Sequence, residues 1–171
     1  MSRRVLLCGV WLLVLTLVAC TQQTAPLPEN VVSTDADIEA ITALLHRNGQ
    51  LISSEDLNGW VDQFTEDAIF MHSDSALVKG REAGREFARP WYEQFDHDFR
   101  VSVDEVQVAG DLAFARWSFV SRPTPKSGGE TVERTGKEIW VFKRQLDLSW
   151  KCSHIIYNYD SPLPLPQSAS G

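Results

Sequence analysis

Positive charge is scarce in this sequence, which has 16 lysines and arginines against 23 aspartates and glutamates and a formal net charge of -7. A phosphate backbone requires a basic stripe, so this balance disfavours nucleic-acid binding. The sequence also lacks a glycine-rich phosphate loop, a Ser-His-Asp nucleophile elbow and a zinc-ligand pattern, and we predict neither a cofactor nor a metal. With 171 residues, of which 43% are hydrophobic and 23% charged, the chain is instead typical of one soluble globular domain.

The N-terminus has the features of an export signal. Arg3 and Arg4 precede an almost wholly apolar run from Val5 to Ala19, as in a positive n-region followed by an h-region. A membrane span needs about 20 apolar residues, so we expect this run to be cleaved rather than kept. Its end, Leu-Val-Ala-Cys up to Cys20, resembles the lipobox of bacterial lipoproteins, which implies a signal peptide over residues 1–19 and an acylated Cys20. A plain secretory signal that happens to contain a cysteine is the alternative.

The same resemblance implies where the mature protein is found. Thr21 follows the cysteine in place of the aspartate associated with inner-membrane retention, which implies a cell-envelope lipoprotein of the outer membrane, facing the periplasm. Residues 20–34 are polar and aperiodic and are predicted to tether the lipid to the folded part. Because Cys8 is removed and Cys20 is lipidated, Cys152 is the one remaining thiol and no internal disulfide can form. Cys152 is expected to be buried and inert rather than a nucleophile.

Helices are predicted in the first half of the mature chain. Apolar residues at helical spacing predict one helix over about 35–52 and a second, shorter helix capped by Ser54. The short apolar stretch 68–72 predicts a strand. A third helix is expected over about 80–95, and Pro90 should bend or interrupt it.

The second half is predicted to be nearly all strand. Apolar residues alternate from Phe99, and their parity changes near Asp104 and Glu105, which indicates a β-bulge. Residues 161–171 are rich in proline and are expected to be a frayed tail. Three helices followed by four long strands imply the α+β class, with a curved antiparallel sheet and helices on one side. The three further strands are predicted over residues 112–121, 131–143 and 149–159.

Three short motifs occur in a fixed order: Phe-Thr-Glu-Asp-Ala at 64–68, Gly-Arg-Glu-Ala at 80–83 and Trp-Lys-Cys-Ser-His at 150–154. Their order and spacing resemble the nuclear-transport-factor-2-like superfamily over residues 35–160, and within it the SnoaL-like and ketosteroid-isomerase-like branch. The resemblance implies a cone-shaped domain in which a curved sheet packs against three N-terminal helices and the open end is a pocket. Members include isomerases, dehydratases, cyclases, hydrolases and binding proteins, so the fold alone does not supply a function.

Candidate site residues follow from this resemblance and from the strand pattern. In ketosteroid-isomerase-like members the general base is an aspartate five residues after the aspartate of the first motif, and counting from Asp67 gives His72. An imidazole is a usable base near neutral pH, but the change from aspartate means that the isomerase mechanism does not transfer directly; a hydrogen-bonded residue at the pocket mouth is the alternative. Arg116 interrupts an apolar strand and could bind a ligand carboxylate or pair with Asp/Glu. His154 matches the last-strand histidine of the family, with a core histidine hydrogen-bonded to a neighbouring strand as the alternative.

Aromatic and acidic side chains give further candidates. Trp60 and Trp91 are candidate ligand contacts, although core packing explains them more simply. Asp96, His97 and Asp98 are three ligand types in a row, but neighbouring strand residues point to opposite faces, so an exposed loop and no metal site are expected.

Two functions are compatible with these features. The first is a lipid-anchored binding or interaction domain with no assignable reaction, whose pocket holds a small apolar or amphipathic molecule. The second is a lyase, isomerase or hydrolase acting on a small organic substrate, with His72 as general base and Arg116 as anion partner. We favour the first, because only one residue matches a catalytic position and its identity has changed. Strands 112–121 and 131–143 are apolar on both faces, so a homodimer through the sheet is also predicted.

Overall fold

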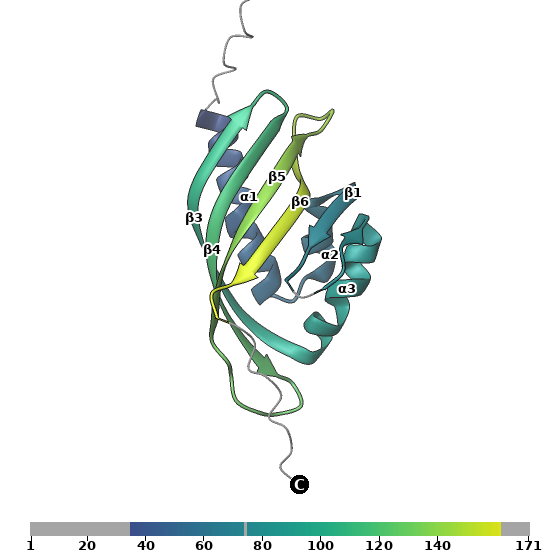
Figure 1. Cartoon of the computed structure of the whole chain (residues 1–171), viewed down its shortest axis with the longest axis vertical. Helices are drawn as coiled ribbons and strands as arrows, with labels where there is room; N and C mark the ends of the chain where they lie inside the picture. Colours follow the sequence, from purple (N-terminus) through teal and green to yellow (C-terminus); the bar gives the residue numbers. More distant parts are fainter. Residues whose placement is uncertain (1–34, 74, 162–171) are drawn as a thin grey trace, which may run out of the picture.

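The computed structural model describes residues 35–73 and 75–161 and arranges them as three helices and a six-stranded sheet (Figure 1). The predicted signal peptide, Cys20, the tether and the tail from residue 162 lie outside the described residues. Within those residues, none of the helices combines the length and the apolarity needed to cross a membrane. The elements are α1 Asp35–Ser53, α2 Leu57–Asp62, β1 Phe64–Met71, β2 Val78–Lys79, α3 Arg81–Gln94, β3 Phe95–Ala109, β4 Leu112–Pro125, β5 Arg134–Arg144 and β6 Trp150–Tyr159.

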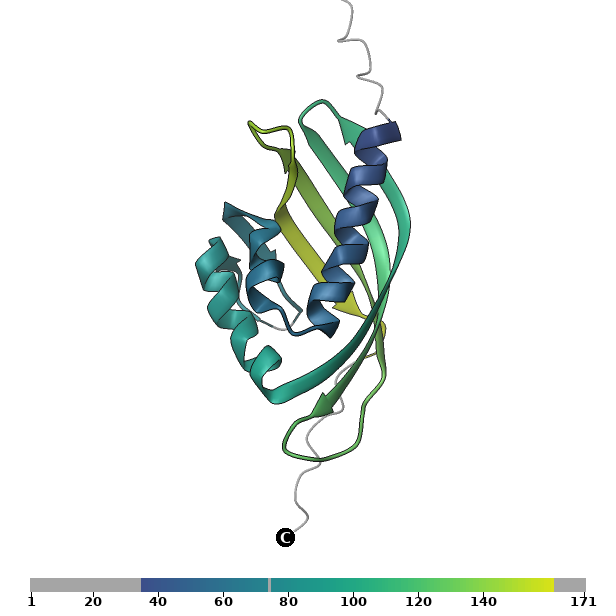
Figure 2. The same cartoon turned by 180° about the vertical axis from the view of Figure 1, so that it is seen from behind.

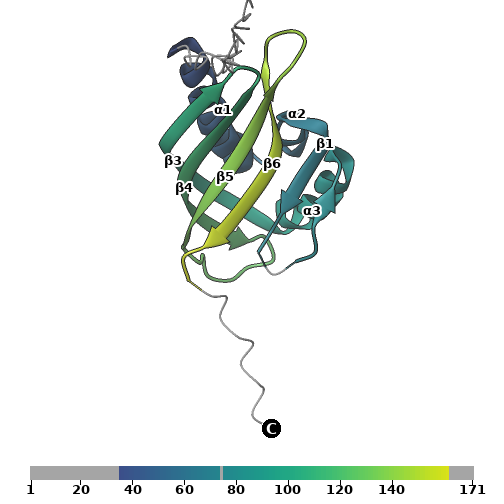
Figure 3. The same cartoon turned by 45° about the horizontal axis from the view of Figure 1, so that its top comes forward.

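The strands lie in the order β2-β1-β6-β5-β4-β3. The predicted curved sheet with helices on one side is confirmed, and so is the bulge, which shifts the β3–β4 register between Val103 and Glu105. One feature differs: β1 pairs in parallel with β6, whereas the other pairs are antiparallel. This pairing joins two distant parts of the chain, and a parallel pair needs such a long connection. Figure 3 shows β1 beside β6, with α3 beyond it.

Helices cover one face of the sheet (Figure 2). α1 lies across it and buries Ile41 and Leu45 completely. α3 packs closely on β1, because Gly84 faces the Phe70 ring and a Cβ atom there would lie 2.5 Å from it. This close approach fixes α3 against the strand that ends next to His72.

The helix boundaries differ from the predictions in two places. Asp56, not Ser54, is the N-cap of α2, since its Oδ1 accepts a 2.8 Å hydrogen bond from the Gly59 amide. The Ser54 hydroxyl instead donates to the Leu51 carbonyl at the end of α1. Pro90 does not interrupt α3, which continues to Gln94. A proline removes one backbone donor, and the helix nevertheless continues past it and buries Tyr92.

The strand boundaries also differ from the predictions. β1 begins at Phe64, four residues before the predicted start, and β5 spans 134–144 rather than 131–143. The short strand β2 was not predicted. The segment 96–98 is not an exposed loop: it belongs to β3, whose pairing with β4 extends to Phe95 opposite Pro125, and His97 is buried.

The other face of the sheet, which Figure 1 views, carries exposed apolar side chains. Leu112 is 53%, Ile139 43% and Ile156 40% exposed. Ile139 and Ile156 are direct register partners in the middle of β5 and β6. An apolar cluster at the centre of an open sheet face is suited to self-association, and we propose that a second copy of the chain covers it.

This proposal predicts that the protein sediments as a dimer at micromolar concentration and that Ile139→Lys sediments as a monomer, because a buried lysine without a partner destabilises an interface. Leu146→Lys is the matched control, since Leu146 is fully exposed in the turn between β5 and β6. A wild-type monomer, or equal behaviour of the two variants, would contradict the proposal.

Candidate functional site

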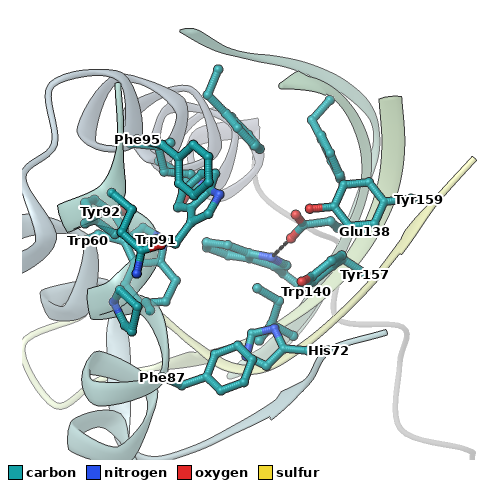
Figure 4. Close-up of a pocket in the computed structure, with 18 residues that line it drawn as sticks. Trp60, His72, Phe87, Trp91, Tyr92, Phe95, Glu138, Trp140, Tyr157 and Tyr159 are labelled. Carbon is teal, nitrogen blue, oxygen red and sulfur yellow. Dashed lines mark hydrogen bonds between the residues drawn. The ribbon is translucent and has the colours of Figure 1, made fainter. Parts of the chain in front are cut away.

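A cavity of about 400 Å³ lies between the helices and the curved sheet (Figure 4). Its wall is mostly aromatic and includes His72 and Glu138, while none of the described residues that line it is a lysine or an arginine. The cavity is therefore apolar with a few polar groups, the usual character of a small-molecule site. The aromatic lining residues are Trp60, Phe87, Trp91, Tyr92, Phe95, Phe99, Phe119, Trp140, Tyr157 and Tyr159.

His72 directly follows β1 and lies in the cavity wall. Its ring stacks on Phe87, with 4.0 Å between centroids and 9° between planes, and meets Tyr157 edge-on at 5.3 Å. Both ring nitrogens are buried and have no hydrogen-bond partner within the described residues. Burial lowers the pKa of His72 to about 4, so the imidazole is neutral at neutral pH.

Glu138 is the acidic group of the cavity, and sequence reasoning missed it. It lies on β5, opposite Trp117 of β4 and Tyr157 of β6. The residue is 8% exposed, and its Oε2 accepts a 2.6 Å hydrogen bond from Trp140 Nε1. Burial raises the pKa of Glu138 to about 8, against the opposing effect of that hydrogen bond. The carboxyl group therefore carries a proton at neutral pH.

A signal for Glu138 exists in the sequence. Residues two apart on a strand share a face, and Glu138 shares its face with Trp140 and Phe142, which are both buried. A single acid in line with buried aromatics marks either a charged partner or a ligand site.

Two tyrosines of β6 continue the wall beside Glu138. Burial raises the pKa of both Tyr157 and Tyr159, so both phenols are neutral. The Arg134 guanidinium lies over the Tyr159 ring, 3.2 Å from its centroid. Across the cavity the Tyr92 hydroxyl is buried with no hydrogen-bond partner among the described residues.

Arg116 does not join His72 in the cavity. Its side chain is on the outer face of β4, where it pairs with Asp104 at 3.0 Å and Glu105 at 3.5 Å. The bulge in β3 brings both acids opposite Arg116. The expectation that Arg116 binds a ligand together with His72 is corrected: its neighbour Trp117 is completely buried, and strand alternation directs Arg116 outward.

His154 is also outside the cavity wall. Ile155 and Tyr157 line the cavity, so His154 lies on the opposite side of β6. Its Nδ1 is 3.1 Å from the Ser153 hydroxyl, and its register partners are Ile69 and Val141. This contact is with the preceding residue of β6, and His154 is only partly buried, so the structure shows neither a ligand position in the cavity wall nor a core histidine bonded to a neighbouring strand.

Trp60 and Trp91 both line the cavity. Trp60 also packs in the core, edge-on to Phe64 at 4.7 Å. Trp91 contacts the His97 ring at 3.7 Å, and His97 Nε2 is 3.2 Å from the Trp91 carbonyl oxygen. His97 thus supports the wall from behind, and no group of three possible metal ligands occurs within 35–73 and 75–161.

Cys152 is free and buried, as predicted. Its Sγ lies 3.3 Å from the His154 carbonyl oxygen. Burial raises the pKa of this thiol well above its ordinary value, which disfavours the nucleophilic thiolate.

Comparison with known proteins places this geometry in a family. A ketosteroid isomerase-like protein from Erwinia carotovora atroseptica is 19% identical with a TM-score of 0.69, over 75% of this chain and 100% of that one. A nuclear-transport-factor-2-like protein from Novosphingobium aromaticivorans is 24% identical with a TM-score of 0.62, over 78% and 85%. A hexachlorocyclohexane dehydrochlorinase is 15% identical with a TM-score of 0.66, over 78% and 91%. These similarities show a shared fold.

No curated protein matches the chain. The profile of the SnoaL-like domain family matches residues 34–156, which is most of the chain and includes His72, Glu138 and the rest of the cavity up to Ile155. The chain therefore belongs to the SnoaL-like domain family, with the cone fold of the nuclear-transport-factor-2-like proteins.

Proposed function

We propose that this domain binds a small, largely apolar organic molecule in its cavity, and that lipidated Cys20 holds it at the cell envelope, at the outer membrane facing the periplasm. The aromatic wall of a 400 Å³ cavity is the observation that carries the binding function. Ligand pockets have volumes of about 300–1,000 Å³ and apolar walls with a few placed polar groups. Here those groups are His72, Glu138, the amides of Asn48 and Gln94, and the hydroxyl groups of the tyrosines.

A second candidate function is proton transfer during an elimination, the chemistry in the name of the similar dehydrochlorinase. One observation favours it: the neutral His72 imidazole has no hydrogen-bond partner within the described residues and faces the same cavity as the protonated Glu138. His72 would accept the proton from carbon, and chloride would leave. Arg116 takes no part in this reaction as an anion partner, since it is on the outer face of the sheet.

Filling the cavity should abolish binding. Ala88 lines the cavity from α3, and Ala88→Phe places a ring in the ligand volume. We expect the fluorescence enhancement of the neutral probe N-phenyl-1-naphthylamine to be present with the wild-type chain in maltoside detergent and lost with this variant. Ala83→Phe, on the exposed side of the same helix, should bind as the wild type does. Equal binding by both variants would place the probe elsewhere and contradict the proposal.

The elimination can be tested through chloride release from hexachlorocyclohexane. His72→Asn should slow it by about 10²-fold or more, because the base is removed. In the wild type the rate should be present above pH 4 and fall as the pH drops through the His72 pKa of about 4, where the imidazole gains a proton. His154→Asn is the control, since His154 is not in the cavity wall. Absence of chloride release by the wild type would remove this candidate.

The lipid anchor has its own test. Cys20→Ser should prevent acylation, and the chain should leave the membrane fraction because acyl chains, rather than residues 5–19, hold the mature protein there. Cys152→Ser, which alters the buried thiol, should remain in the membrane fraction. Retention of Cys20→Ser in membranes after a high-salt wash would show that the N-terminal segment is itself the anchor.

A further inference from the structure

The described residues that line the cavity include an acidic side chain but no cationic one. Glu138 is the only acidic side chain among the described residues that line it, and no cationic side chain lines it. Glu138 makes its hydrogen bond with an indole N–H, and no lysine or arginine pairs with it within 35–73 and 75–161. The guanidinium of Arg134 lies behind the Tyr159 ring of the wall and is not among the groups that line the cavity, and its Nη2 is buried without a hydrogen-bond partner among the described residues. Burial without a cationic partner keeps this acid protonated, and a cation placed beside it in the cavity would stabilise its ionised form.

Aromatic rings surround this acid. Trp140 donates the hydrogen bond, Tyr157 is the register partner across the sheet, and Tyr159 is beside it in the wall. The face of an aromatic ring carries negative charge and attracts cations. The Tyr159 ring already contacts a cation in this way, because the Arg134 guanidinium lies 3.2 Å from its centroid.

We propose that the ligand of the cavity is an organic cation, a quaternary ammonium or a lipophilic amine, whose charge lies against Glu138 and the rings of Trp140 and Tyr157. This inference rests on the proposed binding function and names the class of molecule bound. An anion would find no cation in the wall. The net charge of -7 favours the approach of a cation from solution.

Binding of a cation must displace the proton of Glu138, whose pKa burial raises to about 8. The other titratable groups that face Glu138 keep one state between pH 6 and pH 8. Burial raises the pKa of the phenols and the thiol and lowers that of the imidazole to about 4. These groups are Tyr157, Tyr159 and Cys152 on β6, His72 after β1, Tyr92 on α3 and Arg134 on β5.

The test compares two ligands of the same shape, benzyltrimethylammonium and its uncharged carbon isostere neopentylbenzene. Titration calorimetry with the full chain in maltoside detergent, with detergent alone as the blank, gives Kd at pH 6, 7 and 8. The Kd of the cation should fall roughly 50-fold from pH 6 to pH 8, following the ionised fraction of a carboxyl of pKa about 8. The Kd of neopentylbenzene should not fall. A cation Kd that is constant with pH would overturn the proposal.

Proton release gives a second measurement that needs no variant. In two buffers of different ionisation enthalpy, benzyltrimethylammonium should release about 0.9 proton per molecule bound at pH 7, because that fraction of Glu138 is protonated before binding. Binding without proton release would also overturn the proposal.

Glu138→Gln keeps the shape of the side chain and an acceptor for Trp140. It should remove the pH dependence of cation binding and most of the affinity, while neopentylbenzene still binds. Glu130→Gln makes the same substitution in the exposed loop after β4 and should leave the binding of both ligands unaffected. If neopentylbenzene binds and the cation does not, the cation inference fails and the proposed binding function stands. If neither ligand binds, both fail.

Discussion

The cavity exists because the helices cover the curved sheet unequally. α1 touches the sheet directly beside the cavity: a Cβ atom on Gly49 would lie 3.0 Å from the Val101 side chain, while the neighbouring Asn48 and Ile52 line the cavity. Asp37 in the first turn of α1 holds the opposite end of this helix to the sheet, since its carboxylate accepts two hydrogen bonds from Arg144 and one from Trp150 Nε1. On the other side of the cavity α3 stands away from the sheet, and large rings of α3 and β6 face each other across an open volume.

Glu138 is an unfavourable residue for stability at its position. The difference between an ordinary glutamate pKa of 4.5 and about 8 corresponds to roughly 5 kcal/mol against the ionised form in the folded state. A buried acid that lacks a cationic partner is often less stable than an apolar residue of similar volume. Perturbed acids in cavities are typical of functional sites. The position of Glu138 among aromatic rings is therefore better explained by what the cavity holds than by the folding of the domain.

The sequence predicts the layout of the domain better than its site. Local patterns were sufficient for the three helices, the four long strands and the bulge, because amphipathic period and parity are properties of neighbouring residues. The parallel pairing of β1 with β6 and the strand conformation of 96–98 depend on distant partners and could not be predicted from local pattern. Glu138 was missed because the strand around it is apolar on both faces. The pattern therefore does not show which residues of the strand face the core, and Glu138 could not be identified as a buried acid. His72 was found only through the spacing that the family shares.

Polar groups on the two sides of the sheet differ in whether they are paired. On the outer face Arg116 forms ion pairs with both Asp104 and Glu105. On the side that the helices enclose, the nitrogens of His72 after β1 and the hydroxyl of Tyr92 on α3 have no hydrogen-bond partner within the described residues. Buried polar groups in folded proteins are nearly always satisfied. Both residues line the cavity, so these unpaired polar groups lie just beneath its wall, and this makes the enclosed side of the sheet the one suited to recognition.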